Sequence, residues 1–333
     1  MSFLAPMQDI TDAGFMRIIA EYGAPDFFAA EYFRIHEYFD FEPRVLEAVL
    51  ARPAGKKVSA QFIGEDETLL ARAAEKLLRY ESVDMLDLNL GCPAPKIYRK
   101  NVGGGLLRDR RKVESVMRVL RAAWPKTLSV KMRLGFESDA GFWDIFNTLT
   151  DCGADFITIH GRTVRGLYRE KVSYEKIFEA SRKSAVPVIA NGDIDAPQKA
   201  LFIRGNSECA GVMAGRCAVR NPWIFRQFAE ALRGEKVFRP TLGDLRGYVE
   251  KLWRAIEGCE PKIKYPDARL KKFLNFAGVG VDSEGAFLYK MRRAQGAAEL
   301  LDVCDKFLTG EFENAEFNCA GYENLCPRPN HEK

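Results

Sequence analysis

Short apolar runs alternate with amphipathic segments through the first two-thirds of the chain. Apolar runs bounded by turn residues predict buried strands, here over Phe3–Met7, Asp26–Phe33, Lys57–Gly64, Met85–Cys92, Leu128–Gly135, Phe156–Arg162, Pro187–Asp193 and Gly211–Arg216. Apolar residues at three- and four-residue spacing predict the intervening helices, at Ala13–Tyr22, Thr68–Arg79, Arg110–Ala123, Phe142–Asp151, Tyr174–Lys183, Pro197–Arg204 and Pro222–Arg233. Such alternation predicts an α/β fold, a (β/α)₈ TIM barrel.

The pattern changes after Gly234, where strand-like runs stop. Helical spacing continues over Leu242–Glu257, Asp267–Asn275 and Glu284–Leu308. The last residues, 309–333, show no periodicity. We therefore expect a catalytic barrel over 1–238, a small all-helical C-terminal domain over 239–308, and a tail over 309–333.

Composition excludes several classes of protein. The 333 residues are 47% hydrophobic and carry a net charge of only +4, too mild to indicate a nucleic-acid partner by itself. No stretch approaches the roughly 18–20 apolar residues of a membrane span, and the N-terminus does not read as a signal peptide. The 8 cysteines and three histidines lack metal-ligand spacing. We expect a cytoplasmic protein with reduced thiols, no membrane association and no metal.

Polar residues gather at the predicted strand ends, which is where barrel enzymes carry their chemistry. Seven of the eight strands end in polar groups or special backbone: Pro6-Met7-Gln8, Gln61, Asn89 with Cys92, Lys131 with Arg133, His160, Asn191-Gly192-Asp193 and Gly215-Arg216. Buried polar groups without partners are costly, so this convergence predicts a bound polar ligand. The last two ends occupy the usual phosphate position of the fold, although tight structural turns are the alternative.

Lys131 and His160 have two interpretations each. An ammonium group inside a barrel mouth needs an anionic partner, and a reduced flavin is negatively charged at its N1–C2 edge. Lys131 pointing outward between helices is the alternative. His160 either donates to a flavin or substrate or is a structural histidine, and Gln61 suits the amide edge of a flavin ring.

One stretch, 85–109, reads MLDLNLGCPAPKIYRKNVGGGLLRD. It resembles the signature of the tRNA-dihydrouridine synthases, flavoenzymes that reduce uracil rings in RNA. The residues on the family's pattern are Asp87, Asn89, Gly91, Cys92 and Pro93. The motifs APM, VKMRLG, HGRT, NGD, and GR followed by NPWIF extend the resemblance over nearly the whole barrel.

The resemblance implies an FMN site, with NADPH as the reductant. By matching motif, FMN contacts fall on Pro6, Met7, Gln8, Gln61, Lys131, His160, Asn191, Gly192, Asp193, Gly215 and Arg216. Uracil contacts fall on Asn89, Arg133 and Tyr168. It also implies the tRNA D-arm as partner, and we expect a monomer.

Cys92 then has a defined role as general acid. Reducing the C5–C6 bond of uracil requires a hydride at C6 and a proton at C5. A thiol with an ordinary pKa is mostly protonated at neutral pH and able to give up its proton, whereas a nucleophilic cysteine needs a depressed pKa. We therefore expect no strong activation of Cys92. A small buried thiol is the alternative.

Basic residues predict where RNA binds. Lys96, Arg99 and Lys100 follow Cys92, and the helical segment contributes Lys271, Lys272, Arg292 and Arg293 among interleaved aromatics. A base must leave its stack to reach a buried flavin, and RNA phosphates need cations around the opening. The alternatives are a solvated charged face and aromatics that form helix core.

The sequence thus predicts a tRNA-dihydrouridine synthase that reduces a uridine of the D-loop. Alternatives are an FMN enzyme acting on a free pyrimidine, the same chemistry on ribosomal RNA, and an inactive RNA-binding barrel. Two departures from the family's pattern stand out: Gly104 or Gly105 replaces a small residue such as Ser or Ala, and FLNFAG replaces a segment containing His and Tyr. Which uridine is reduced does not follow from the sequence.

Overall fold

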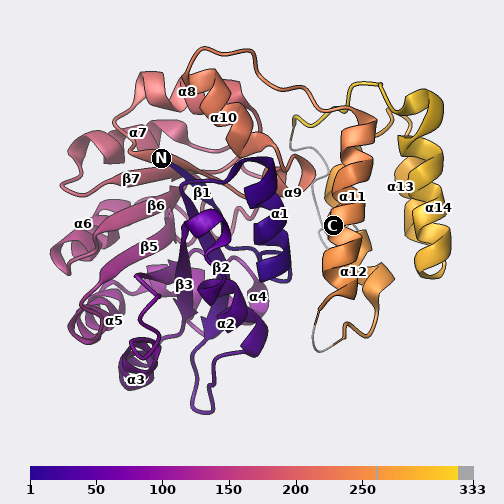
Figure 1. Cartoon of the computed structure of the whole chain (residues 1–333). Helices are drawn as coiled ribbons and strands as arrows, with labels where there is room; N and C mark the ends of the chain where they lie inside the picture. The colour runs from indigo at the N-terminus through magenta and orange to yellow at the C-terminus, as the bar shows by residue number, and fades with distance from the viewer. Residues whose placement is uncertain (260–261, 322–333) are drawn as a thin grey trace. The chain divides into compact units, whose positions relative to one another are not determined.

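The computed structural model describes residues 1–259 and 262–321. Eight parallel strands pair in chain order and close into a barrel (Figure 1). The strands are β1 (Ser2–Leu4), β2 (Phe27–Arg34), β3 (Lys57–Ile63), β4 (Met85–Leu90), β5 (Thr127–Arg133), β6 (Phe156–His160), β7 (Val188–Asn191) and β8 (Gly211–Ala214). The predicted (β/α)₈ barrel is confirmed.

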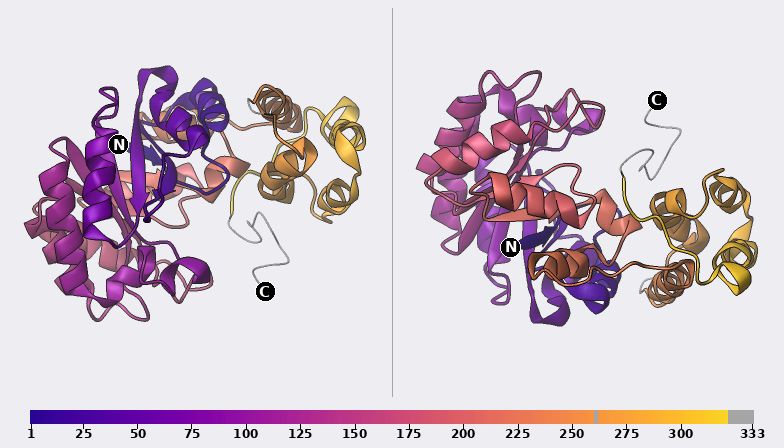
Figure 2. Two further views of the ribbon diagram at one scale, coloured as in Figure 1. Left: turned by 90° about the horizontal axis from the view of Figure 1, so that it is seen from below. Right: turned by 90° about the horizontal axis from the view of Figure 1, so that it is seen from above.

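Helices alternate with the strands along the chain, as two further views show (Figure 2). They are α1 (Ala13–Gly23), α2 (Pro43–Leu50), α3 (Glu67–Leu77), α4 (Pro95–Tyr98), α5 (Arg110–Ala123), α6 (Phe142–Asp151), α7 (Tyr174–Lys183), α8 (Pro197–Asn206), α9 (Arg216–Arg220) and α10 (Ile224–Leu232). The predicted bounds of α5, α6 and α7 agree with the structure. The pattern missed α2, which is short but begins at Pro43, a favoured first helical residue.

All the predicted strands except the second overran the observed ones at their C-terminal ends. β4 stops at Leu90 because the next backbone N–H groups, at Gly91 and Cys92, donate to the side chain of Asn89 rather than to a neighbouring strand. β7 stops at Asn191, and Gly192 follows with a φ of 117°. Cys92 and Asp193, which were expected to end these two strands, therefore lie in the loops that follow β4 and β7.

The barrel interior changes character along its axis. An apolar cluster contains Phe3, Ala5, Ile189 and Met213, and residues at the strand starts pack against it: Phe27, Phe156 and Ala210. Towards the strand ends the strand register aligns polar residues in pairs: Gln61 with Asp87, Asn89 with Lys131, and His160 with Asn191. The apolar end is packed core, so a polar ligand would be met only at the strand ends.

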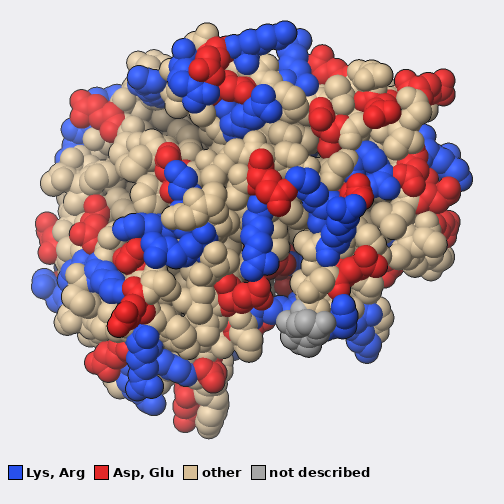
Figure 3. Space-filling view, in the orientation of Figure 1, with Lys and Arg blue, Asp and Glu red and all other residues tan. Residues whose placement is uncertain are grey.

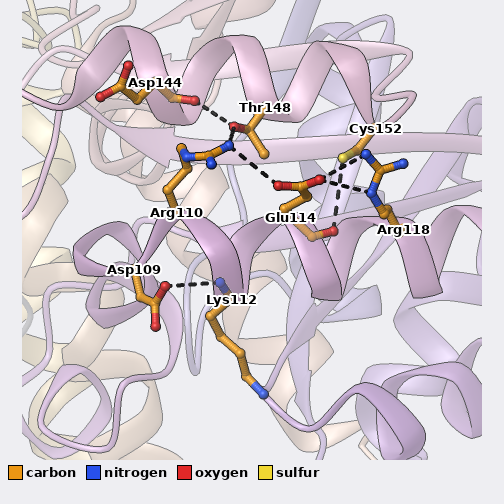
Figure 4. A network of polar contacts seen from close by, with 8 residues as sticks. All are labelled: Asp109, Arg110, Lys112, Glu114, Arg118, Asp144, Thr148 and Cys152. Atoms are coloured by element: carbon orange, nitrogen blue, oxygen red, sulfur yellow. Dashed lines mark hydrogen bonds and ion pairs between the residues drawn. The ribbon is translucent and has the colours of Figure 1, made fainter.

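A polar network ties α5 to α6 on the outside of the barrel (Figure 4). The Arg110 guanidinium donates to Thr148 Oγ1 at 3.3 Å and pairs with Glu114 at 3.4 Å. The thiol of Cys152 lies 3.9 Å from the carbonyl oxygen of Glu114. The ion pair lies within α5 and, being exposed, contributes little by itself, so the hydrogen bonds of Arg110 to Thr148 and of Cys152 to Glu114 are what join the two elements.

The chain divides into two compact units. The first contains Met1–Ala13, Asp26–Gly192 and Phe202–Met213, and the second contains Gly14–Pro25, Asp193–Leu201 and Ala214–Lys333. Helices of the second unit beyond the barrel are α11 (Leu242–Glu257), α12 (Pro266–Ala277), α13 (Ala286–Arg293) and α14 (Gly296–Leu308).

The segment predicted as helical over Glu284–Leu308 forms two helices instead of one continuous helix. The helical conformation is interrupted between α13 and α14, where Gly296 has a φ of 70°. Of the predicted tail, Gly310–Phe312 forms a 3-10 turn and Glu316 bridges to Thr241, while 322–333 lie outside the described residues. No helix in the described ranges combines the length and apolar character needed to cross a membrane.

Candidate active site

A short turn places Cys92 at the end of β4. The Asn89 side-chain oxygen accepts hydrogen bonds from the backbone N–H groups of Gly91 (3.0 Å) and Cys92 (2.9 Å). Asparagine is favoured in turns for this reason. A β-carbon at Gly104 would lie 2.8 Å from the carbonyl oxygen of Cys92 and 2.6 Å from Val164. The departure from a small side chain at this position therefore lets the glycine segment close against the cysteine loop.

The Cys92 thiol stays protonated at neutral pH. Burial raises its pKa, while the Ala94 backbone N–H and the positive charges of Arg133, Arg34 and Lys131 act in the opposite direction. Burial dominates, so the thiol is not an activated nucleophile. This agrees with the expectation for a general acid.

Arg133 links the Cys92 loop to the loop after β6. Its Nε donates to the Gly91 carbonyl at 2.9 Å, and its Nη1 donates to the carbonyls of Thr163 (2.8 Å) and Leu167 (2.7 Å). The guanidinium lies 5.3 Å from the centre of the Tyr168 ring. Tyr168 in turn meets His160 edge-on, 6.3 Å between ring centres. The structure thus brings these three predicted residues together with the cysteine loop.

Lys131 points into the barrel rather than outward between helices. Its ammonium donates to Asn191 Oδ1 at 2.9 Å, and Asn191 Nδ2 donates to the Met213 carbonyl at 2.7 Å, which orients the amide. Burial lowers the pKa of Lys131 to about 8, and the charge of Arg133 adds to that effect. A partly buried ammonium beside a second cation is an environment that favours an anionic ligand.

Asp87 lies below Asn89 on β4 and is buried. Its carboxylate accepts from Gln61 Nε2 at 2.7 Å and from Ser129 Oγ at 2.6 Å. Burial raises its pKa to about 6. Sequence reasoning did not select Asp87 or Ser129 as site residues, because Met85–Leu90 was interpreted as an apolar run. Period-two alternation on the strand would have placed Asp87 on the face of Asn89.

The charge on Asp87 should cost stability. Its folded pKa is raised above the value near 3.8 of an unfolded chain, so folding is penalised increasingly as pH rises from about 4 to 6 and fully above 6. Asp87→Asn should therefore raise the free energy of unfolding by about 2–3 kcal/mol at pH 8, with no gain at pH 4. Denaturant melts at the two pH values measure this. Equal gains at both would contradict it.

The glycine that follows β7 approaches its neighbours closely. A β-carbon at Gly192 would lie 3.0 Å from Val172 and 3.2 Å from the His160 ring. The Tyr174 hydroxyl donates to the backbone carbonyl of Gly192 at 2.5 Å. In the second unit, Arg216 Nη2 lies 3.8 Å from Asp193 Oδ1. Arg216 begins α9, and Gly215 precedes it, instead of both ending the strand.

The loop after β1 and the end of β2 add residues that sequence reasoning missed. Met7 N–H donates to Thr11 Oγ1 at 3.0 Å, and the Tyr32 hydroxyl donates to Gln8 Oε1 at 3.1 Å. Burial, and then the negative charge of a Cys92 thiolate, raise the pKa of Tyr32. Arg34, whose charge favours that thiolate, ends β2 one residue beyond the predicted strand.

The predicted basic residues differ in their surroundings. Lys96, Arg99 and Lys100 are exposed. Lys271 is half-buried and donates to the Ala294 carbonyl at 2.6 Å, at the end of α13. The remaining ones also lie in the second unit: Lys272 is half-buried, Arg292 donates to Asn275 at 2.8 Å, and Arg293 stacks 3.6 Å from the Tyr289 ring centre. Figure 3 shows Lys and Arg interspersed with Asp and Glu over the visible face.

The fold and the strand-end cluster define a (β/α)₈-barrel enzyme. Residues 3–277 match the dihydrouridine synthase family, and the chain belongs to that family, whose members are oxidoreductases. It is 36% identical to a "Probable tRNA-dihydrouridine synthase" of Helicobacter pylori over 230 residues, 68% of this chain and 69% of that protein. It is 28% identical to a "tRNA-dihydrouridine(16) synthase" of Neisseria meningitidis over 312 residues, 91% and 93% of the two chains.

A solved structure supports the fold alone. A variant of NCR from Zymomonas mobilis superposes with a TM-score of 0.51 at 14% identity, covering 73% of this chain and 89% of that chain. Within the part of the chain that the structure describes, no group of three or more His, Cys, Asp and Glu residues is arranged to hold a metal ion.

Proposed function

We propose that this protein is a tRNA-dihydrouridine synthase that reduces the C5–C6 bond of a D-loop uridine, with FMN as its flavin and NADPH as the reductant. The observation that carries the proposal is a protonated Cys92 thiol in a loop held by Asn89 and Arg133. The names of the relatives support tRNA as substrate. We further propose that the enzyme acts in the cytoplasm.

The residues present fit a flavin. Lys131 offers a partly buried positive charge for an anionic ring edge, and Gln61 offers an amide at a fully buried position. At Gly192 a β-carbon would crowd Val172 and the His160 ring and would strain a backbone with a φ of 117°. These groups would hold the isoalloxazine ring, and the family's motifs assign the phosphate to Asp193, Gly215 and Arg216. When bound, FMN supplies the hydride for C6 of the uracil.

The chain's own residues handle the proton and the base. Cys92 Sγ holds the proton that C5 receives. The positive charges of Arg133, Arg34 and Lys131 favour the thiolate that remains, so proton loss becomes less costly as the reaction proceeds. Asn89 and Tyr168 would contact the uracil, since they flank Cys92 from β4 and from the loop after β6.

We propose position 16 as the target. The Neisseria meningitidis relative is named for that position, and its match covers 91% of this chain. A match of that length includes residues of the C-terminal helices as well as the barrel. The test maps dihydrouridine in total RNA from cells with and without the gene. Loss of dihydrouridine at position 16 of tRNA is expected. Loss of dihydrouridine at another tRNA position, or in ribosomal RNA, would show that the target is not position 16. No loss in cells that lack a redundant synthase would contradict the proposed function.

We propose that 239–308 bind the tRNA through phosphates. Lys290→Glu and Arg293→Glu, both at exposed positions of α13, should each weaken tRNA binding and reduce the slope of log K against log salt by about 1. Lys271 is unsuitable for this test because it donates to the end of α13. Lys183→Glu on α7 is the matched charge reversal on the barrel. An unchanged slope for the α13 variants would contradict the surface.

A further inference from the structure

Three buried side chains, those of Asp87, Gln61 and Asn89, form a line of hydrogen bonds that leads to the cysteine loop. Gln61 Nε2 donates to Asp87 at 2.7 Å, and Asn89 Nδ2 donates to Gln61 Oε1 at 2.8 Å. Asn89 Oδ1 then accepts from the backbone of Gly91 and Cys92 at 3.0 and 2.9 Å. The line therefore runs from a carboxylate on β4, through β3, back to the loop that carries the thiol.

The two ends of this line determine its direction. An ionised carboxylate only accepts hydrogen bonds, and backbone N–H groups only donate them. The amides between them can satisfy both ends in one orientation: Gln61 must turn its nitrogen to Asp87, and Asn89 must turn its oxygen to the loop. Ser129 Oγ, which donates to the other Asp87 oxygen at 2.6 Å, keeps that carboxylate an acceptor.

Because the side chains of this line are buried, the loss of one hydrogen bond affects the next. Gln61 is 0% exposed and Asp87 6% exposed, so water cannot readily replace a missing partner. A buried donor that has lost its acceptor destabilises the fold by the full free energy of its desolvation. Removing Asp87 would leave Gln61 Nε2 in that state, and the amide would gain by rotating away from the orientation that supports Asn89.

We propose that Asp87 is a positioning residue: through Gln61 and Asn89 it holds the Gly91–Cys92 turn, and it leaves Asn89 with one N–H to offer a ligand. The amide nitrogen carries two protons, and one is used by Gln61. The remaining N–H can donate to an acceptor of a ligand, such as a ring carbonyl. This second part rests on the proposed function.

Site-resolved alkylation of the full-length protein tests the turn without flavin or RNA. Native protein is treated with iodoacetamide, and each cysteine is quantified by mass spectrometry. Asp87→Ala should raise labelling of Cys92 about tenfold, as expected for the loss of one buried hydrogen bond. Asp87→Asn, whose oxygen still accepts from Gln61, should stay within about twofold of wild type.

Controls separate positioning from general loosening. Thr158→Val removes a hydroxyl that is 0% exposed and has no hydrogen-bond partner among the described residues, so it should leave labelling unchanged. The buried thiols Cys152 and Cys304 report on the rest of the fold. Unchanged Cys92 labelling in Asp87→Ala would overturn the proposal. So would a parallel rise at the buried thiols, or an Asp87→Asn variant that behaves like Asp87→Ala.

Turnover tests the consequence for the reaction. With tRNA as substrate, Asp87→Ala should lower kcat at least tenfold with KM changed less than twofold, because tRNA affinity comes mainly from phosphates, and Asp87→Asn should recover most of the rate. If labelling behaves as expected but no RNA is reduced, the positioning role stands and the proposed function fails.

Discussion

Cys92→Ala should lower the rate of uridine reduction by about 10²–10⁴-fold, the usual contribution of a general acid. Reduction of the flavin by NADPH should be unchanged, because the thiol is needed only when C5 receives its proton. The thiol is suited to this step because burial keeps it protonated while three nearby cations favour the thiolate product. Stopped-flow spectroscopy separates the two half-reactions: flavin bleaching reports reduction by NADPH, and recovery of its absorbance with tRNA reports transfer to uridine.

Two further cysteine variants sharpen this test. Cys92→Ser keeps a small polar group but is a far weaker acid, so it should also be slow. Cys209→Ala removes a partly exposed thiol that precedes β8, on the strand-start side of the barrel, and should react like wild type. Near-normal uridine reduction by Cys92→Ala would remove the thiol from the mechanism.

Lys131→Met should produce the second largest effect, about 10²-fold weaker retention of FMN or an equivalent loss in its reduction, since a charged donor to the ring edge contributes about 1.5–3 kcal/mol and also pairs with the negative charge of the reduced ring. The wild-type affinity should also depend on pH. The pKa of Lys131 without ligand is about 8, so the ammonium is charged below that pH and neutral above it. FMN affinity should therefore fall as pH rises through 8.

Fluorescence titration of FMN at pH 6 to 10 measures this dependence. Lys131→Met should show weak binding with a flat profile. Lys131→Arg should bind without weakening above pH 8, because arginine stays charged throughout this range. A wild-type profile that shows no decline above pH 8 would mean that the Lys131 charge does not contribute to binding.

Sequence reasoning performed best where a signal is local. The bounds of α5, α6 and α7 follow from helical spacing, and the strand order follows from eight alternating units in a fold whose parallel strands close on themselves. It failed where a single residue changes the geometry. Gly296 breaks the helix predicted over Glu284–Leu308, and a side chain, that of Asn89, ends β4 two residues early by replacing a strand partner.

The sequence by itself determined the barrel, the family and the set of polar strand ends, because periodicity and motifs are properties of neighbouring residues. Only the tertiary structure decided what each side chain contacts. Gln61 and Ser129 reach Asp87 across 26 and 42 residues of chain, and Lys271 reaches the end of α13 across 23. Hydrogen-bond partners, burial and the resulting pKa shifts depend on strands and helices that meet only in the folded chain.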